Sequence, residues 1–230
     1  MNDTVYQAAA LIVPMIFAIV FHEVAHGLVA RMLGDPTAAQ LGRLSLNPLR
    51  HVDPIGTVLL PGALKLMGLP VFGWAKPVPV DFHRLRNPKR DMILVAAAGP
   101  GMNLLMAGVG AALLGLLLRP YIGVQEPAGV AGFVALNLTN FIAINVFLAL
   151  FNLLPIPPFD GSHIVEGLLP DSLSRGYGSL RKYGFLLVIG LIVVAPQLIP
   201  GFDPVGAMIG TPFAWMMKQY LHVLTFFAGA

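Results

Sequence analysis

The stretch that decides the fold is Phe17-Ala18-Ile19-Val20-Phe21-His22-Glu23-Val24-Ala25-His26-Gly27, a His-Glu-x-x-His motif inside an almost wholly apolar segment. A helix advances about 100° per residue, so His22 and His26 project from the same face and can share one metal ion. Neutral imidazole suits Zn²⁺, and two histidines with one carboxylate from elsewhere leave the fourth position open for water. Glu23 lies beside them, which favours it as the base that acts on this water.

The surroundings of the motif strengthen this hypothesis. No charged residue lies between Ala8 and Phe21, and the apolar character resumes from Gly27 to Val29, so the motif is carried into hydrocarbon. One ionisable side chain at bilayer depth costs roughly 2.5 to 3.5 kcal/mol unless it faces protein or water. Two histidines and a glutamate together therefore indicate a shared function.

The composition is that of an integral membrane protein. Of 230 residues, 57% are hydrophobic and 11% are charged, and the mean hydropathy is +0.78, which lies outside the soluble range. The absence of cysteine excludes disulfides, so zinc ligands must be His, Asp or Glu. The net charge of +3 gives no indication of nucleic-acid binding. The N-terminal apolar run lacks a basic region and carries the motif itself, so we do not expect a removable signal peptide.

Long uncharged runs predict an all-α polytopic membrane protein with a three-span catalytic core. The expected spans cover about residues 8–33, 92–118 and 130–154. Residues 184–200 and 204–227 are expected to form one or two further C-terminal spans. The chain is then a single membrane-embedded domain over 1–230, with its core at about 8–161 and C-terminal helices at about 162–230.

The region between the first two spans is mixed. Phe72 to Val80 reads as an extended segment whose prolines fit only an edge strand. Residues 55–69 are apolar but are interrupted by Pro61, Gly62 and Lys65. This interruption favours a short re-entrant helix over a full span, because irregular backbone at membrane depth needs a cover of protein or trapped water.

Two polar side chains stand out near the later spans. Asn103 lies inside the second span and is expected to be an interior hydrogen-bonding group, which either joins helices or contacts substrate. Asp160 is the only carboxylate at the boundary that follows the third span. On its own Asp160 fits a turn residue or the N-cap of a helix beginning near Ser162, but with two ligands already present it is the preferred third ligand. His163 is its rival.

The basic residues predict the orientation. If residues 34–91 and 155–183 share one side, that side holds eleven of the fourteen Lys and Arg residues, whereas the 119–129 loop holds only Arg119. By the positive-inside rule the rich side is cytoplasmic. His22, His26 and Asp160 then lie together in the cytoplasmic half of the cell membrane.

The chain resembles the site-2 protease family of intramembrane zinc metalloproteases, in its compact bacterial and archaeal form without PDZ or CBS domains. The resemblance is carried by HEVAH at 22–26, NPLRHVDPIGT at 47–57, FGWAKPVPVD at 72–81, RNPKRDM at 86–92, AGPGMN at 98–103 and NLLPIPPFDG at 152–161. It implies that His22, His26 and Asp160 bind one Zn²⁺ and that Glu23 is the catalytic glutamate. The family usually has Leu-Asp-Gly where this chain has Phe159-Asp160-Gly161, an exchange of one apolar residue for another.

The resemblance also implies where substrate binds. Asn152 and the prolines after it, Pro158 among them, match positions that the family associates with substrate recognition, and Phe72 to Asp81 matches its membrane-associated β-hairpin. A substrate helix must unwind before its carbonyls reach zinc, and an edge strand near Trp74 can pair with the freed backbone. The expected substrates are transmembrane proteins in the lipid bilayer.

Other classes of function stay open at this point. A zinc-binding but inactive membrane scaffold would keep the fold and the ligands. A metal transporter would need a polar path through the apolar half above His22. A prenyl-protein endopeptidase generally uses a glutamate as third ligand, and neither Glu126 nor Glu166 is well placed for that role. The sequence indicates neither the substrate nor the oligomeric state.

Overall fold

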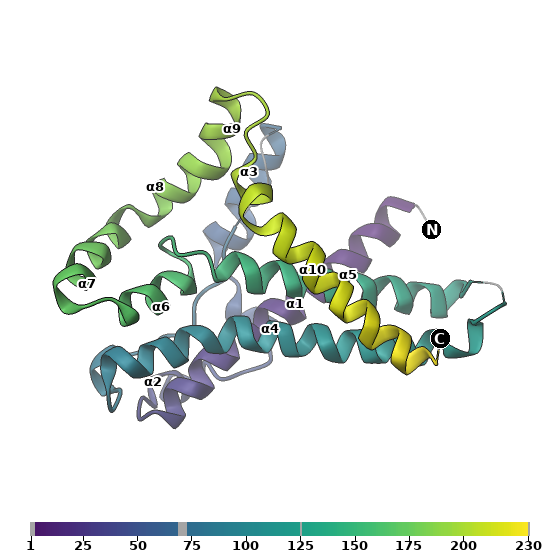
Figure 1. Cartoon of the computed structure of the whole chain (residues 1–230), viewed down its shortest axis with the longest axis horizontal. Coiled ribbons are helices and arrows are strands. Elements are labelled where there is room, and N and C mark those ends of the chain that lie inside the picture. Colours follow the sequence, from purple (N-terminus) through teal and green to yellow (C-terminus); the bar gives the residue numbers. More distant parts are fainter. Residues whose placement is uncertain (1–2, 69–72, 125, 230) are drawn as a thin grey trace.

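The computed structural model describes residues 3–68, 73–124 and 126–229 (Figure 1). These residues are mainly helical and contain no β-strand. Four helical stretches among them are long and apolar enough to cross a membrane, namely 5–32, 88–121, 129–152 and 171–198. The predicted all-α polytopic membrane protein is therefore confirmed.

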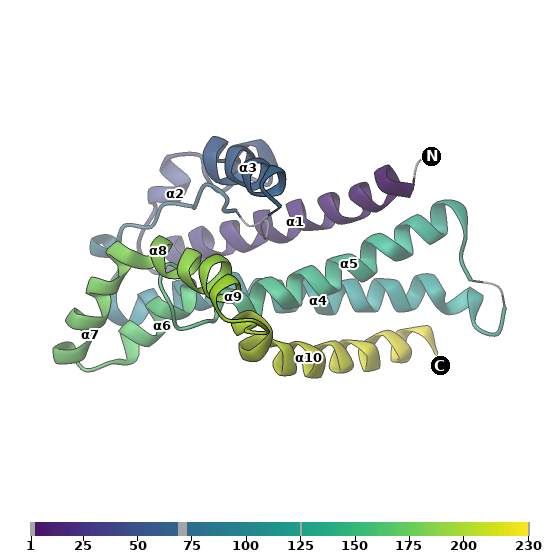
Figure 2. The ribbon, with the colours of Figure 1, turned by 90° about the horizontal axis from the view of Figure 1, so that it is seen from above.

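The body of the molecule is a bundle of α1 (Asp3–Met32), α4 (Pro88–Leu118), α5 (Gly129–Asn152) and α10 (Pro204–Ala228). Helices α1 and α10 lie on opposite sides of the α4–α5 pair (Figure 2). Small residues let the helices approach closely. A Cβ at Gly110 would stand 3.1 Å from the Phe141 ring, and one at Gly115 would stand 2.9 Å from Phe227 Cβ.

The start of α1, the end of α10 and the 3-10 turn η4 (Arg119–Tyr121), which follows α4, lie at one end of the bundle. The opposite end carries α2 (Thr37–Gln40), α6 (Asp160–Leu168) and α7 (Asp171–Gly178), as Figure 1 shows. The Lys89 ammonium ties the start of α4 to this end, because it donates to the Leu169 carbonyl at 2.7 Å and pairs with Asp171 at 2.6 Å.

A closed neck follows α1, where the chain leaves the bundle at Leu33–Asp35 and returns at Asp81–Arg86, which includes the 3-10 turn η3 (Phe82–Arg84). The Asp35 carboxylate accepts the Thr37 N–H at 2.9 Å and the Asp81 N–H at 2.7 Å. The Arg86 N–H donates to the Leu33 carbonyl at 3.1 Å. Burial raises the pKa of Asp35, but the hydrogen bonds from Thr37 and Asp81 outweigh it and hold that pKa below its usual value.

The excursion between the two sides of the neck contains short helical pieces. They are α2, the 3-10 turn η1 (Pro48–His51), the π-helical turn η2 (Pro54–Leu59) and α3 (Leu60–Leu66). The continuous piece Pro54–Leu66 is about 20 Å long at 1.5 Å per residue, which is too short for a crossing. This agrees with the short helix expected at 55–69, of which residue 69 lies outside the described part. Its re-entrant position stays a prediction.

Residues 73–81 form an extended segment without a strand partner. Alternate N–H groups along one edge of this segment donate hydrogen bonds within the protein. The Trp74 N–H donates to the Gly56 carbonyl at 3.1 Å, and the Lys76 N–H donates to the His51 carbonyl at 2.8 Å. The expected β-hairpin is therefore not confirmed among the described residues, and Phe72 lies outside them. Pro77 and Pro79 lack N–H groups, and the partners come from turns rather than from a second extended chain.

The C-terminal third continues through α6, α7, the 3-10 turn η5 (Ser179–Tyr183), α8 (Gly184–Ile189), the π-helical turn η6 (Gly190–Val194) and α9 (Ala195–Leu198). The apolar stretch 171–198 covers the span expected at 184–200 except for its last two residues. Helix α10 matches the span expected at 204–227 in extent but is not among the four long apolar stretches, since Lys218, Gln219 and His222 lower its hydropathy. It nevertheless packs along α4 and α5.

Candidate metal centre

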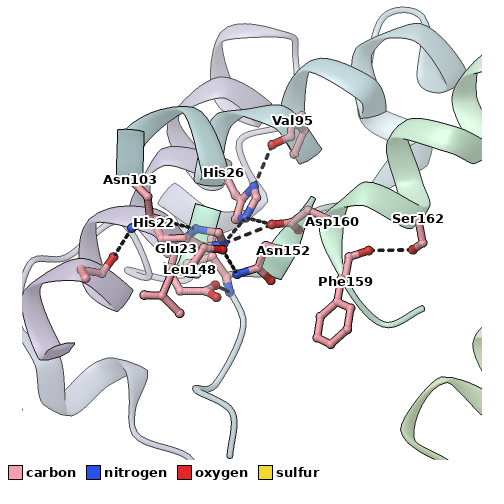
Figure 3. Close-up of polar contacts among 12 residues, drawn as sticks. His22, Glu23, His26, Val95, Asn103, Leu148, Asn152, Phe159, Asp160 and Ser162 are labelled. Atoms are coloured by element: carbon pink, nitrogen blue, oxygen red, sulfur yellow. Dashed lines mark hydrogen bonds and ion pairs between the residues drawn. The ribbon is translucent and has the colours of Figure 1, made fainter. Parts of the chain in front are cut away.

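Three side chains from two helices converge inside the bundle, as Figure 3 shows. His22 and His26 lie on one face of α1, and Asp160 is the first residue of α6. The two histidine Nε2 atoms are 3.0 Å apart, and Asp160 Oδ2 lies 3.1 Å from His22 Nε2 and 3.3 Å from His26 Nε2. In the part of the chain that the structure describes, this is the one group of three that could hold a metal ion.

Hydrogen bonds behind the rings fix the tautomer of both histidines. His26 Nδ1 lies 2.7 Å from the Val95 carbonyl oxygen, which only accepts, so this nitrogen carries the hydrogen. His22 Nδ1 lies 2.6 Å from Asn103 Oδ1. The Asn103 amide nitrogen faces the Ala18 carbonyl at 3.2 Å, which identifies the opposite end of that amide as oxygen. Both Nε2 atoms therefore present a lone pair.

The three facing atoms have no hydrogen to share. Two lone-pair nitrogens and a carboxylate oxygen stand 3.0 to 3.3 Å apart, and Asp160 Oδ2 is buried without a hydrogen-bond partner. Such a set is repulsive by itself and is satisfied by a cation. A tetrahedral zinc with bonds of about 2.0 to 2.2 Å keeps its ligand atoms about 3.3 to 3.5 Å apart. The residues present thus fit Zn²⁺ and leave one position of a four-coordinate ion for another group.

A glycine on α4 leaves the space for the ion. A Cβ added at Gly99 would stand 2.6 Å from His22 Nε2 and would contact His26 Nε2 as well. Real Cβ atoms essentially never approach a heavy atom within 3.0 Å. Any side chain at this position would occupy the space toward which the lone pairs of both Nε2 atoms point. The space for the ion therefore depends on the absence of a Cβ at Gly99.

The Glu23 carboxylate is held by the extended segment. Its Oε2 accepts the Val78 N–H at 2.7 Å, and Val78 is the one residue between Pro77 and Pro79 that has an N–H to give. The buried Val78 side chain packs on α1 one turn further on, where a Cβ at Gly27 would stand 2.8 Å from Val78 Cγ1. The bond uses one oxygen of the Glu23 carboxylate and fixes its direction.

His163, the other candidate for the third ligand, lies outside the group formed by His22, His26 and Asp160. His163 lies one turn further along α6, and the Arg181 guanidinium donates to its Nδ1 at 2.9 Å. Burial, followed by the positive charge of Arg181, lowers the pKa of His163 to about 4. Its ring is therefore neutral but is engaged away from the three-residue cluster, which does not include it.

The four residues expected at the substrate lie in different settings. Asn103 is fully buried, and its amide groups hydrogen-bond to His22, the Ala18 carbonyl and Asn145, which favours the expected role of joining helices over contact with substrate. Asn152 is half-buried, and its NH₂ donates to the Leu148 carbonyl at 2.9 Å. Pro158 is exposed, and Trp74 stacks edge-on against Phe185 with ring centroids 5.3 Å apart.

Sequence reasoning missed three features of this site. The Val78 N–H, the Val95 carbonyl and the space at Gly99 belong to backbone, which residue identity does not reveal. The placement of Val78 between two prolines was the one available signal, because it leaves a single donor in an otherwise donorless stretch. The contact of Asn145 with Asn103 likewise depends on how α4 and α5 pack.

Comparisons with known proteins agree with this chemistry. Residues 121–195, which include Asp160, match the family model described as "Peptidase family M50". The chain is 38% identical over 202 residues to "Putative zinc metalloprotease YwhC" of Bacillus subtilis, covering 85% of this chain and 88% of that protein. No solved structure is significantly similar.

More distant relatives come from mycobacteria. The chain is 32% identical over 180 residues to "Putative zinc metalloprotease Rip2" of Mycobacterium tuberculosis, covering 77% of this chain and 63% of that protein. It is 28% identical over 188 residues to "Putative zinc metalloprotease Rip3" of the same species, covering 80% of this chain and 37% of that protein.

Proposed function

Since this chain belongs to peptidase family M50, we propose that it is an intramembrane endopeptidase that hydrolyses peptide bonds in or near the transmembrane segments of other membrane proteins. The chain is a zinc metalloprotease and a multi-pass membrane protein. The proposal concerns where it cuts and which residues do so.

The observation that carries the proposal is the position of the metal cluster within a helix that can span a membrane. His22 lies in the apolar stretch 5–32, ten residues before its end, which is about 15 Å along the helix axis. Asp160 meets it at the start of α6, eight residues beyond the end of α5. A peptide bond must therefore come to membrane depth to meet these residues, and transmembrane segments are the substrates present there.

Each residue of the site has a separate role in the proposed reaction. His22, His26 and Asp160 hold the ion, which when bound supplies Lewis-acid polarisation of the scissile carbonyl and activation of a water. Glu23 takes the proton of this water and passes it to the leaving amine. The Val78 N–H holds one oxygen of Glu23, so that the other oxygen is left for the proton transfer.

Substrate docking is proposed along the extended segment 73–81. The N–H groups of Trp74, Lys76 and Val78 face one edge and are used within the protein. Alternate residues face opposite edges, so Ala75 presents its N–H and carbonyl to the other edge, where an unwound substrate can add as a strand. Trp74 on this segment, with Asn152 and Pro158 on the loop before Asp160, would then contact the substrate.

The same site is proposed to face the cytoplasm. Residues 34–91 and 155–183 carry eleven of the fourteen basic residues. Of their elements, α2, α6 and α7 lie at the end of the bundle opposite the turn η4. Topology reporters fused near Arg86 and near Arg175 should both read cytoplasmic, while one fused at Glu126 should read external. Opposite readings at Arg86 and Arg175 would contradict this arrangement.

The decisive experiment compares the intact protein with Glu23→Gln in cells that express a panel of tagged single-span membrane proteins. Glutamine is nearly isosteric, so zinc content and fold should survive, while cleavage should fall about 10² to 10⁴-fold because the base is lost. Uncleaved substrate should be recovered with the mutant from detergent extracts. A zinc-binding scaffold would behave alike with either residue, and a transporter would change metal flux without affecting any membrane protein. Near-normal cleavage by Glu23→Gln would refute the role of Glu23.

A further inference from the structure

We infer that Asn103 and Asn145 act together as positioning residues for zinc binding, by holding His22 in the tautomer and orientation that direct its Nε2 to the metal. This inference deepens the proposed function, since it concerns the same metal site. It assigns a role to two buried amides that lie on two different helices, α4 and α5.

The hydrogen bonds form a chain that crosses three helices. It begins on α5, where the Asn145 NH₂ donates to the Phe141 carbonyl at 2.8 Å. The Asn145 Oδ1 then accepts from the Asn103 NH₂ of α4 at 2.8 Å. The Asn103 Oδ1 finally accepts from His22 Nδ1 of α1 at 2.6 Å. Each hydrogen bond fixes the orientation of the next side chain in the series.

Backbone carbonyls determine the direction of this chain at both amides. The Phe141 carbonyl accepts only, so the Asn145 nitrogen must face it and the Asn145 oxygen must face α4. The Ala18 carbonyl likewise takes the second hydrogen of the Asn103 NH₂ at 3.2 Å. Asn103 is thereby left with its oxygen toward His22, and a flipped amide would set two donors against each other.

Burial makes this direction hard to replace. Asn103 and Asn145 are both 0% exposed, and they lie within helices that can span a membrane. In such a place water is not present to take over a lost hydrogen bond. Without the Asn103 oxygen, the His22 ring loses the acceptor that keeps its hydrogen on Nδ1 and its lone pair on Nε2. Partners of this kind behind a metal ligand typically contribute 10 to 100-fold in metal affinity.

A neighbouring asparagine provides a matched control. Asn140 also lies on α5 and also joins helices, because its NH₂ donates to the Ala10 carbonyl of α1 at 2.8 Å. It lies three turns of α1 away from the His22 level, since Ala10 precedes His22 by twelve residues. Loss of this bond removes the same kind of interhelical contact but touches nothing that contacts the metal.

The experiment measures zinc affinity of the full chain in detergent by competition with a chelator, together with the unfolding temperature of the metal-free protein. Asn103→Leu should weaken zinc binding about 10 to 100-fold. Asn145→Leu should weaken it less, because the Ala18 carbonyl still holds the Asn103 amide. The double variant should bind zinc no more weakly than Asn103→Leu alone, since both changes interrupt one chain. Asn140→Leu should lower the unfolding temperature but leave zinc affinity unchanged.

The outcomes separate this inference from a failure of the metal site itself. If the unaltered protein binds no zinc, or if His22→Ala binds it as well as the unaltered protein does, the metal site is wrong. If the unaltered protein binds zinc and Asn145→Leu matches it in affinity, or if Asn140→Leu weakens zinc as much as Asn145→Leu does, the two amides merely join helices and the inference is overturned. Asn145→Leu decides the matter even if Asn103→Leu does not fold.

Discussion

Substitution of Gly99 by alanine tests the geometry of the metal centre with a single methyl group. The new Cβ would stand 2.6 Å from both His22 Nε2 and His22 Cε1, and it would also overlap His26 Nε2. Relief to the 3.0 Å that real Cβ atoms keep requires a displacement of at least 0.4 Å between α4 and the imidazoles. Ligand distances in metal sites are held to about ±0.2 Å, so the required shift is about twice what the site tolerates.

Gly99→Ala should therefore abolish zinc binding while the helices remain. The assay is zinc content per purified chain, with helical content by circular dichroism and cleavage of a membrane substrate measured in parallel. Gly101→Ala is the matched control, because it lies two residues further along α4 and a Cβ there has no heavy atom within 4 Å. Alanine favours a helix over glycine by about 1 kcal/mol, so this control should bind zinc and be no less stable. One full zinc and normal cleavage in Gly99→Ala would refute the position assigned to the ion.

Two further predictions concern the third ligand and the base. Asp160→Ala should lose zinc while His163→Ala keeps it, because the Asp160 carboxylate faces both histidines and the His163 ring pairs with Arg181; the reverse result in metal analysis would transfer the assignment to His163. Val78→Pro removes the N–H that holds Glu23, and a hydrogen bond to a charged group contributes about 1.5 to 3 kcal/mol, so kcat should fall about 10 to 100-fold with zinc content unchanged. Val78→Ala keeps the N–H and should cleave nearly normally; equal activity of the two variants would contradict the role of this bond.

The sequence predicts the parts of this site that depend on local geometry. His22 and His26 share a face because residues four apart in a helix lie on the same face. Uncharged apolar runs of this length predict membrane-spanning helices. Asp160 is predictable because no other carboxylate lies at that boundary. These features need no knowledge of how the helices pack.

The features that depend on packing are not predictable in this way. The Asn103 oxygen reaches His22 because of how α4 is rotated against α1, and the pattern of one helix does not contain that rotation. The same holds for the contact of Val78 with Glu23, which joins residues 55 positions apart. The segment at 73–81 looked like half of a hairpin because its composition is that of an edge strand, but its partners are turns and a glutamate side chain.

Because the neck beside α1 closes the segment between Asp35 and Asp81, the length of that segment can change without moving the neck. Asp35 binds Asp81 across 46 positions, and Val78 lies only three residues inside that closure. The hydrogen bond from Val78 to Glu23 is therefore positioned by the neck and does not depend on the length of the chain between the two sides of the neck. Doubling a flexible loop costs only about 0.6 kcal/mol in closure entropy. Insertions or deletions at Gly62 or Gly68, where an added Cβ meets nothing within 4 Å, should therefore leave the hydrogen bond between Val78 and Glu23 unchanged.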